Sequence, residues 1–369
     1  MESRSEIAVV QRLIANRLDQ STIGEKAIAG IVGDSPSHYS KSPALWNAVF
    51  NRLGIPAVYL PFDVDVAHVG ALLAALKRSP RFMGVNVTVP HKVLVIDYLD
   101  GLDADAARIG AVNTIGKNPG GKLIGYNTDG AGFIDSILLP TPGERRPFIA
   151  ALDGMNVLLL GAGGSARAVA FHLSDHLGTG NLIIANRTRA HADELAGEIA
   201  KRGRPARAID DTEIPIWAPK VGLIVNCTTK GQGGVRKLAD GSATMLEPYS
   251  ALAPANPPAL ADGESAHFAK RWHEMAEVDT AAKNRASLAL AGKIPSSTRF
   301  YDLIYHPTAS VFLQHGQSTG HRIMNGKSMI VRQAARACCE RICLTALTAV
   351  GKNDDEIFGT VTEAMFDAW

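Results

Sequence analysis

The chain has 369 residues, of which 46% are hydrophobic and 20% charged, an ordinary globular composition with enough apolar material for two domains. Its 38 Lys and Arg residues against 36 Asp and Glu give a net charge of +2, so charge predicts neither a nucleic acid nor an anionic membrane as partner. No segment has the roughly 20 apolar residues of a membrane span, and residues 1–30 lack a signal-peptide core, which favours a cytoplasmic protein. The four cysteines form no metal-binding pattern, so we expect reduced thiols and no metal site.

The first 138 residues mix helical and strand-like patterns. Hydrophobic periodicity predicts helices over 7–18, 43–53 and 66–76 and strands over 27–32, 58–62 and 83–89. The strand-like segments 111–115 and 122–126 flank the turn sequence Asn118–Gly121, which predicts an antiparallel hairpin. This region therefore predicts an α/β domain with one antiparallel element.

The pattern changes at an exposed Pro- and Gly-containing linker after residue 138. Apolar strands then alternate with helices, which predicts a parallel sheet: strands 156–160, 182–185 and 221–226, and helices 165–177 and 190–201. A charged helix over 268–283, a strand over 300–305 and a long helix over 325–350 complete the chain. We assign 1–138, completed by 325–369, to one domain and 139–324 to a Rossmann-type dinucleotide-binding domain with an insertion over 232–298.

A glycine-rich loop joins the first of these strands to its helix. Gly161, Ala162, Gly163, Gly164 and Ser165 form part of a Gly-x-Gly-x-x-Ala pattern. The first glycine allows a tight turn, the second lets the backbone approach a pyrophosphate, and the helix N–H groups bind the phosphates. A second strand after the helix supports a dinucleotide site.

The end of that second strand predicts which dinucleotide is bound. An acid there usually holds the ribose 2′-hydroxyl of NAD. Here the residues are Asn186, Arg187, Thr188 and Arg189. Guanidinium groups bind a 2′-phosphate that a carboxylate would repel, so we predict NADP.

Four polar clusters follow predicted strands in the first domain. They are Ser40–Pro43, Asn86–Lys92, Gly110–Thr114 and Asn127–Gly130. Each alone is typical of a helix cap or a turn, but together their hydroxyl and amide groups can both donate to and accept from a polyhydroxy ligand.

With these clusters the sequence resembles the shikimate dehydrogenase family. The matches follow the family's order over roughly residues 28–345 and are Ser40-Lys41-Ser42-Pro43, Asn86-Val87-Thr88-Val89-Pro90 with Lys92, Gly110-Ala111-Val112-Asn113-Thr114, Asn127-Thr128-Asp129-Gly130, Gly161-Ala162-Gly163-Gly164, Asn186-Arg187-Thr188, Tyr301-Asp302 with Tyr305, and Met329 with Gln333. The resemblance implies an open two-domain α/β fold with the substrate in the cleft between the domains. It also implies reversible, NADPH-dependent reduction of 3-dehydroshikimate to shikimate, in the chorismate pathway to aromatic amino acids.

The resemblance also implies roles for individual residues. Lys92 and Asp129 would form the catalytic pair. The implied substrate contacts are Ser40 and Ser42 for the carboxylate, and Asn86, Thr88, Asn113, Asp129 and Gln333 for ring hydroxyls, with Tyr305 nearby. The implied cofactor contacts are Gly161–Ser165 for the pyrophosphate, Asn186–Thr188 for the 2′-phosphate, and Leu303 and Gly326 for the nicotinamide.

Oxidation of an alcohol releases a proton together with the hydride, so the reaction needs a group that accepts this proton, and Lys92 is the candidate. Two roles remain open: Lys92 exchanges that proton, or it is a fixed donor that stabilises developing alkoxide charge. Strand alternation points His91 to the opposite face, so we interpret it as a structural residue.

The sequence departs from the family pattern in three places. Near the nicotinamide site it has Cys227, Thr229 and Gln232 where the family usually has Ala, Ser and Met. His191 stands where the family usually has a second Arg, for which Arg189 can substitute. The insertion over 232–298 is several times longer than the usual connection.

The apolar residues Phe268, Trp272 and Met275 of the insertion are expected to pack on a domain or on a partner subunit. We therefore favour a structural or oligomeric role for it, including a homodimer, over a lid on the cleft.

Two alternatives to a biosynthetic enzyme are a quinate/shikimate or aminoshikimate dehydrogenase and a non-catalytic sensor of shikimate or quinate. Arg187 and the paired serines at 40 and 42 favour the biosynthetic enzyme over the first. Retention of both Lys92 and Asp129 argues against a sensor, which needs no proton transfer.

Overall fold

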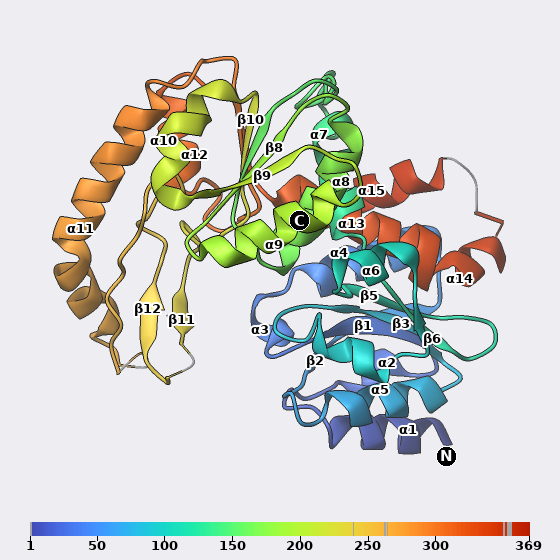
Figure 1. Ribbon diagram of the computed structural model, residues 1–369. Coiled ribbons are helices and arrows are strands. Elements are labelled where there is room, and N and C mark those ends of the chain that lie inside the picture. Colours follow the sequence, from blue (N-terminus) through green and yellow to red (C-terminus); the bar gives the residue numbers. More distant parts are fainter. Residues whose placement is uncertain (1, 239, 262, 264, 350, 353–355) are drawn as a thin grey trace. The chain divides into compact units, whose positions relative to one another are not determined.

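The computed structural model describes residues 2–238, 240–261, 263, 265–349, 351–352 and 356–369. They fold into two compact units (Figure 1). The first contains the chain up to Ser136, Pro140–Arg145, and the chain from Ile330 onward. The second contains Ile137–Leu139 and Arg146–Met329.

The first unit is built on a mixed sheet with the strand order β2-β1-β3-β5-β6-β4. The strands are β1 (Ala27–Gly33), β2 (Ala57–Asp63), β3 (Phe82–Val87), β4 (Gly101–Leu102), β5 (Thr114–Lys117) and β6 (Leu123–Tyr126). β1 pairs in parallel with β2 and β3, whereas β5 pairs antiparallel with both β3 and β6. The predicted hairpin is therefore confirmed, and Gly121, at its turn, has φ +76°.

Helices cover both faces of this sheet, and each face has its own apolar core. The helical segments are α1 (Glu2–Gln11), α2 (Gln20–Ile23), α3 (Pro36–Tyr39), α4 (Ser42–Leu53), α5 (Val69–Arg78), η1 (Leu94–Tyr98), α6 (Ala104–Ile109), α7 (Asp129–Leu138), α13 (Lys327–Ala337), η4 (Cys338–Ile342), α14 (Leu344–Ala349) and α15 (Ile357–Asp367). α1 and α5 pack on one face, and α4, α13 and α15 pack on the other (Figure 1). The helix predicted over 43–53 is confirmed: the buried stripe of α4 includes Leu45, Val49 and Leu53, and the helix ends at the left-handed Gly54.

Two helix predictions were wrong. The first helix ends at Gln11 rather than at residue 18, because the Gln11 amide bonds to the backbone of Asn16 and Leu18 and closes a loop there. The helix predicted over 325–350 is interrupted by η4, which is a π-helical turn, and continues as α14. Three buried cysteines gather at this interruption, and all four cysteines of the chain are free thiols, as expected.

The second unit is a parallel sheet with the strand order β14-β13-β10-β7-β8-β9. The strands are β7 (Val157–Leu160), β8 (Leu182–Asn186), β9 (Ala206–Asp210), β10 (Leu223–Asn226), β13 (Arg299–Asp302) and β14 (Ile323–Met324). The helical segments are α8 (Gly164–His176), α9 (Arg189–Ala200), η2 (Asp211–Glu213), α10 (Ile214–Trp217), η3 (Ala218–Lys220) and α12 (Val311–Ser318). The alternation of strand and helix gives the parallel, Rossmann-type sheet that the sequence predicts, although β9 and α12 were not predicted.

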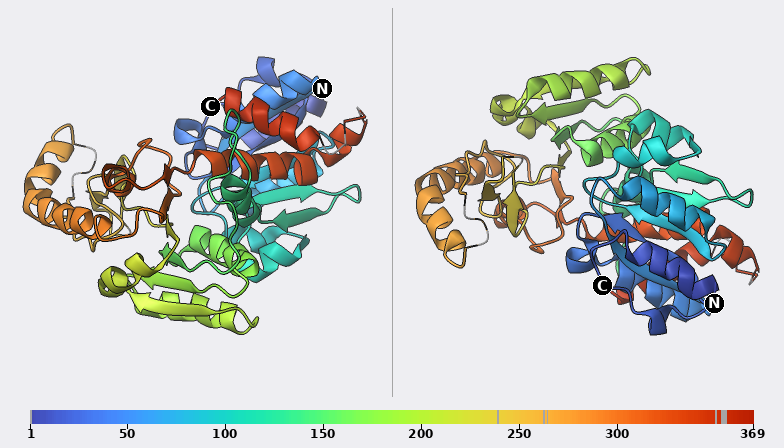
Figure 2. Two further views of the ribbon diagram at one scale, coloured as in Figure 1. Left: turned by 90° about the horizontal axis from the view of Figure 1, so that it is seen from above. Right: turned by 90° about the horizontal axis from the view of Figure 1, so that it is seen from below.

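The predicted insertion forms a small subdomain of the second unit. It consists of the hairpin β11 (Val235–Lys237) and β12 (Ala243–Met245) and the helix α11 (Phe268–Ala291), which lie side by side in Figures 1 and 2. Phe268 and Trp272 are buried against Tyr249, and the rings of Trp272 and Tyr249 meet edge to face at 6.3 Å. Phe268 and Trp272 thus pack within the insertion itself, whereas Met275 remains 60% exposed.

Among the described residues, no helix is both long enough and apolar enough to cross a bilayer.

Candidate active site

Lys92 and Asp129 meet in the first unit, although 37 residues separate them in the chain. Nζ of Lys92 lies 2.5 Å from Oδ2 of Asp129. The N–H of Val112 donates to the Lys92 carbonyl at 2.7 Å and fixes the Lys92 backbone. Asp129 opens α7, where the helix dipole favours a negative charge, and its N–H donates to the Asn127 side chain. The pair is 25% and 10% exposed, which leaves it accessible to a small ligand.

The buried Asn113 connects this pair to the rest of the polar residues. Its amide nitrogen donates to Oδ1 of Asp129 at 2.8 Å and to Oε1 of Gln333 at 3.2 Å. Its amide oxygen accepts from the Thr114 hydroxyl at 2.9 Å and from the Thr128 N–H at 2.9 Å. With both ends of its amide bonded, Asn113 holds Asp129 in one orientation.

The network continues to Asn86, at the end of β3. Nδ2 of Asn86 donates to the Thr114 hydroxyl at 3.0 Å, and its Oδ1 accepts from the Tyr59 phenol at 2.6 Å. The Ser42 hydroxyl also hydrogen bonds to that phenol, and Ser40 Oγ accepts from the Ser42 N–H at 3.2 Å. The structure therefore joins most of the predicted substrate contacts in one network, and it adds Tyr59, which sequence reasoning missed.

Gln333 reaches this network from α13. Arg336, one turn further along α13, forms a bidentate ion pair with Asp135 of α7 at 2.5 and 2.9 Å. Gly132 of α7 allows close approach, because a Cβ at that position would clash with the backbone of Gln333. Together these contacts seat α13 on α7 and place the Gln333 amide beside Asn113.

The remaining residues predicted at the substrate site lie differently. β3 ends at Val87, so Thr88 follows the strand instead of belonging to it, although its N–H still donates to the Val32 carbonyl at 2.9 Å. Tyr305 belongs to the second unit. His91 is 1% exposed, and its Nε2 contacts the Val64 carbonyl at 2.8 Å, which fits a structural residue.

In the second unit, the glycine-rich loop has the geometry that a pyrophosphate needs. Gly161 has φ +108°, and a Cβ there would press on Cys227 and Thr228 at 3.2–3.3 Å. Gly163 caps α8, and nothing lies within 4 Å of a Cβ placed at Gly163 or Gly164. Gly163 and Gly164 are thus exposed at the N-terminus of α8, and the loop from Gly161 to Ser165 fits the phosphates of a dinucleotide.

Two arginines follow β8, and they differ in whether they pair with carboxylates of the described residues. Arg187 is exposed and pairs with no carboxylate of the described residues. Arg189 forms ion pairs with Asp193 at 3.0 Å and with Asp210 at 3.2 Å. Asp210 ends β9, a strand that the sequence analysis missed, whereas Asp193 lies four residues after Arg189 in α9. Asn186 donates to the Thr188 carbonyl and shapes the turn between the two arginines.

A buried carboxyl group lies next to the residues predicted to line the nicotinamide. Asp302, at the end of β13, is fully buried and accepts from Ser310 Oγ at 2.5 Å, from Asn226 Nδ2 at 3.0 Å and from the Ile304 N–H at 3.0 Å. Burial raises the pKa of Asp302 to about 7, against the opposing effect of these three donors. Gly326 packs on Leu303, because a Cβ there would clash with the Leu303 carbonyl oxygen.

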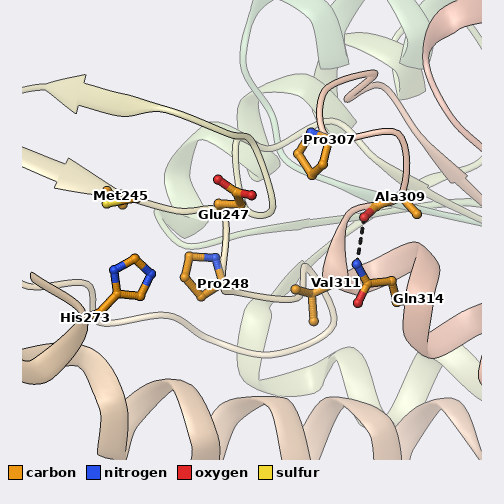
Figure 3. A pocket seen from close by; sticks show the side chains of 8 residues that line it. All are labelled: Met245, Glu247, Pro248, His273, Pro307, Ala309, Val311 and Gln314. Carbon is orange, nitrogen blue, oxygen red and sulfur yellow. Dashed lines mark hydrogen bonds between the residues drawn. The ribbon is translucent and has the colours of Figure 1, made fainter. Parts of the chain in front are cut away.

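A cavity of about 380 Å³ lies elsewhere in the second unit, between the insertion and the start of α12 with the segment before it (Figure 3). Its lining residues are Met245, Glu247, Pro248, His273, Pro307, Ala309, Val311 and Gln314. The Gln314 amide is bonded to the Ala309 carbonyl, and the His273 ring to the Ala269 carbonyl. None of the residues predicted for catalysis or cofactor binding lines this cavity.

Comparison with known proteins agrees with this geometry. Residues 31–115 match the shikimate dehydrogenase substrate binding domain, and residues 146–235 match a domain described as shikimate / quinate 5-dehydrogenase. The NADP(+)-dependent shikimate dehydrogenase of Symbiobacterium thermophilum is 35% identical over 318 residues, which cover 85% of this chain and 88% of that protein. The chain belongs to the shikimate dehydrogenase family.

Further members of the shikimate dehydrogenase family support this assignment. The enzyme of the same name from Moorella thermoacetica is 36% identical over 317 residues, which cover 85% of this chain and 88% of that protein. The crystal structure of the Thermus thermophilus shikimate 5-dehydrogenase with NADP(H) and shikimate superposes with a TM-score of 0.61 at 27% identity, and the match covers 93% of this chain and all of that one.

The two matched family domains do not extend over the whole candidate site. Lys92, Asn86 and Asn113 lie within the first matched segment, whereas Asp129, Tyr305 and Gln333 lie outside both. Residues beyond 235 in the insertion are also unmatched. The roles expected for those residues are therefore not covered by the two domain matches.

Proposed function

We propose that this protein is an NADP-dependent shikimate dehydrogenase that interconverts 3-dehydroshikimate and shikimate. The contact between Lys92 and Asp129, at one end of a buried network of amides and hydroxyls, is the observation that carries the proposal. It combines a proton-transfer group with the several donors and acceptors that a ring with three hydroxyls requires. Membership of the family supplies the substrate class.

In this proposal the substrate ring lies over the network in the first unit. Ser40 and Ser42 bind the carboxylate, and Asn86, Thr88, Asn113 and Gln333 bind ring hydroxyls. Nε2 of Gln333 donates to the Ile330 carbonyl with one hydrogen and has its second hydrogen left for a ligand.

NADPH, when bound, supplies the hydride for reduction of the ring carbonyl. Lys92 Nζ donates the proton to the carbonyl oxygen, which becomes the new hydroxyl, and in the reverse direction the amine of Lys92 takes that proton back. Asp129 orients the ammonium through the 2.5 Å contact and accepts from a neighbouring ring hydroxyl. Asn113 keeps the second oxygen of Asp129 occupied, so that the carboxylate presents one oxygen to this chemistry.

The cofactor is held by residues of the second unit. Gly161, Ala162, Gly163, Gly164 and Ser165 bind the pyrophosphate, and Leu303 and Gly326 line the nicotinamide. Asn186, Arg187 and Thr188 bind the 2′-phosphate. Because Arg189 is already paired with carboxylates, Arg187 provides most of the charge, and Arg189 supports the turn from its ion pairs.

The decisive experiment compares shikimate and quinate as substrates of the purified full-length chain. Reduction of NADP and of NAD is followed by absorbance, with ligand binding measured in parallel by calorimetry. We expect a higher kcat/KM for shikimate with NADP than for any other combination of these substrates and cofactors. A preference for quinate or for NAD would indicate a different dehydrogenase, and binding of shikimate without turnover would indicate a sensor.

We also propose that the protein forms a homodimer through the outward face of α11. This face carries the exposed residues Met275, Val278 and Ala282, with Val278 82% exposed. The spacing of three and four residues places these side chains in one stripe along the helix. A stripe of this kind becomes buried when a second helix packs along it.

Charge favours an antiparallel second copy of the same helix. With the two-fold axis between Val278 and Ala282, Glu274 lies beside Arg285 of the partner subunit, and symmetry repeats the contact. A parallel pair would place each Arg285 beside Arg285 of the partner subunit. The sign of these charges thus supports one orientation.

Sedimentation equilibrium tests the homodimer. Arg285→Glu should yield monomers, because it places two acids together, and adding Glu274→Arg should restore the dimer by exchanging the charges. Lys293→Glu, an exposed reversal beyond the end of α11, should leave the dimer intact. A monomeric unmodified chain, or a double variant as monomeric as the single one, contradicts the proposed interface.

A further inference from the structure

Tyr59 occupies an unusual position for a residue of a buried strand. It is 1% exposed, and its ring stacks on Trp46 with the centroids 4.7 Å apart. The Asn47 side chain forms two hydrogen bonds with the Tyr59 backbone: it accepts from the Tyr59 N–H at 2.9 Å and donates to the Tyr59 carbonyl at 3.0 Å. Ring and backbone are therefore both fixed, and the phenol oxygen has one position beneath the polar network.

The phenol contacts two residues of the proposed substrate site. It donates to Oδ1 of Asn86 at 2.6 Å and is hydrogen bonded to the Ser42 hydroxyl. Burial raises the pKa of the Tyr59 phenol well above its ordinary value, so the group remains a donor throughout the neutral range.

This donor determines how the Asn86 amide is oriented. With Oδ1 facing the phenol, Nδ2 faces the Thr114 hydroxyl at 3.0 Å and the Asn113 carbonyl at 3.4 Å. A flipped amide would direct its oxygen at the Asn113 carbonyl oxygen, so that two acceptors would face each other. The phenol and the carbonyl therefore select the same orientation from opposite ends of the amide.

From Asn86 the hydrogen bonds run in one direction to Asp129, the carboxylate of the proposed catalytic pair. Asn86 donates to Thr114, Thr114 donates to Asn113 Oδ1 at 2.9 Å, and Asn113 Nδ2 donates to Asp129 at 2.8 Å. Because each of these groups donates a hydrogen to the next group in the chain, that hydrogen cannot be donated in the opposite direction. The hydrogen bonds of this chain therefore all point the same way, and the Thr128 N–H, which also donates to Asn113 Oδ1, selects the same orientation of the Asn113 amide.

We propose that Tyr59 is a positioning residue for the substrate site: its phenol sets the direction of a hydrogen-bond chain through Asn86, Thr114 and Asn113 that ends on Asp129. The inference rests on the proposed function and deepens it. Tyr59 acts through Asn86 and Asn113 and need not touch the substrate. Its loss therefore affects shikimate binding more than cofactor binding, because the cofactor residues lie in the second unit.

The test is Tyr59→Phe, which removes only the hydroxyl. We expect the Kd and KM for shikimate to rise about tenfold, which is the loss of one buried hydrogen bond, while the Kd for NADP and kcat change less than about twofold. Tyr249→Phe, which removes a buried phenol from the insertion, is the matched control and should leave all four constants unchanged. Thermal melting of both variants reports any general loss of stability.

A double-mutant cycle distinguishes positioning from packing. Thr114→Val breaks the chain at its next link, so Tyr59→Phe added to it should raise the shikimate Kd little further. Fully additive losses, or a Tyr59→Phe variant with a lower Tm and an unchanged Kd, overturn the inference. If Tyr59→Phe does not fold, Thr114→Val alone must still raise the shikimate Kd. Absence of shikimate binding by the unmodified chain would instead contradict the proposed function.

Discussion

The buried carboxyl of Asp302 should make the stability of the protein depend on pH in an uncommon direction. Its pKa is about 7 in the folded chain against an ordinary value of 3.8, because burial penalises the charged form. The folded state therefore binds more protons than the unfolded state between about pH 4 and pH 7, and stability falls as the pH rises through that window. Above pH 7, the difference of about three pKa units between the folded and the unfolded state lowers the free energy of unfolding by about 4 kcal/mol.

Asp302→Asn removes this titration while keeping the size of the side chain and an oxygen for the Asn226 amide and the Ile304 N–H. Relative to the unmodified chain, the variant should gain about 2–3 kcal/mol between pH 5 and pH 8, the part of the titration that falls in that interval. Urea unfolding of both proteins across this range, followed by fluorescence and compared as differences, measures the gain.

Asp240→Asn is a suitable control, because hydrogen bonds from Ser242 lower the pKa of this exposed carboxyl. It is ionised over the whole interval, so its difference from the unmodified chain should not change between pH 5 and pH 8. A difference for Asp302→Asn that is equally flat would refute the argument that burial governs this group.

Three further outcomes are expected. Lys92→Ala should lower kcat for shikimate about 10²- to 10⁴-fold with a much smaller change in KM, and a kcat that steady-state assays find unchanged would reject both roles of the amine. Arg187→Ala should raise the Kd for NADP about tenfold or more and leave that for NAD unchanged, as measured by fluorescence titration; an equal loss for both cofactors would contradict a contact to the 2′-phosphate. Trp272→Ala should destabilise the insertion by about 3–5 kcal/mol, seen as faster proteolysis around α11, while unaltered proteolysis would show that the aromatic core is not what holds this segment.

Local patterns were sufficient to predict most of the elements that position the site. The sequence indicated β1, β2, the β5–β6 hairpin and the unit β7-α8-β8 because their periods, turn residues and glycines act over a few neighbouring residues. The contact of Lys92 with Asp129 follows the motif assignment, and the structure shows it at 2.5 Å.

The features that were missed depend on contacts between distant segments. Tyr59 lies in a strand of apolar appearance, and only the sheet, in which Ala29 pairs with Tyr59 and Ile31 with Asn86, brings its phenol to the site. Arg189 looked free for a phosphate until β9 brought Asp210 beside it. The π-helical turn at Cys338–Ile342 also has no local signal, because its residues are compatible with an ordinary helix.

The position of Gln333 has a consequence for biosynthesis of the chain. Gln333 bonds to Asn113 across 220 residues, and the α15 residues Val361 and Met365 share a core with Trp46 and Phe50 of α4. During synthesis on the ribosome, almost all of the second unit is made before α13 and α15. Until these helices appear, the face of the first sheet that they cover remains exposed. Nascent chains therefore expose a large apolar surface for a long interval, which is the state that chaperones recognise.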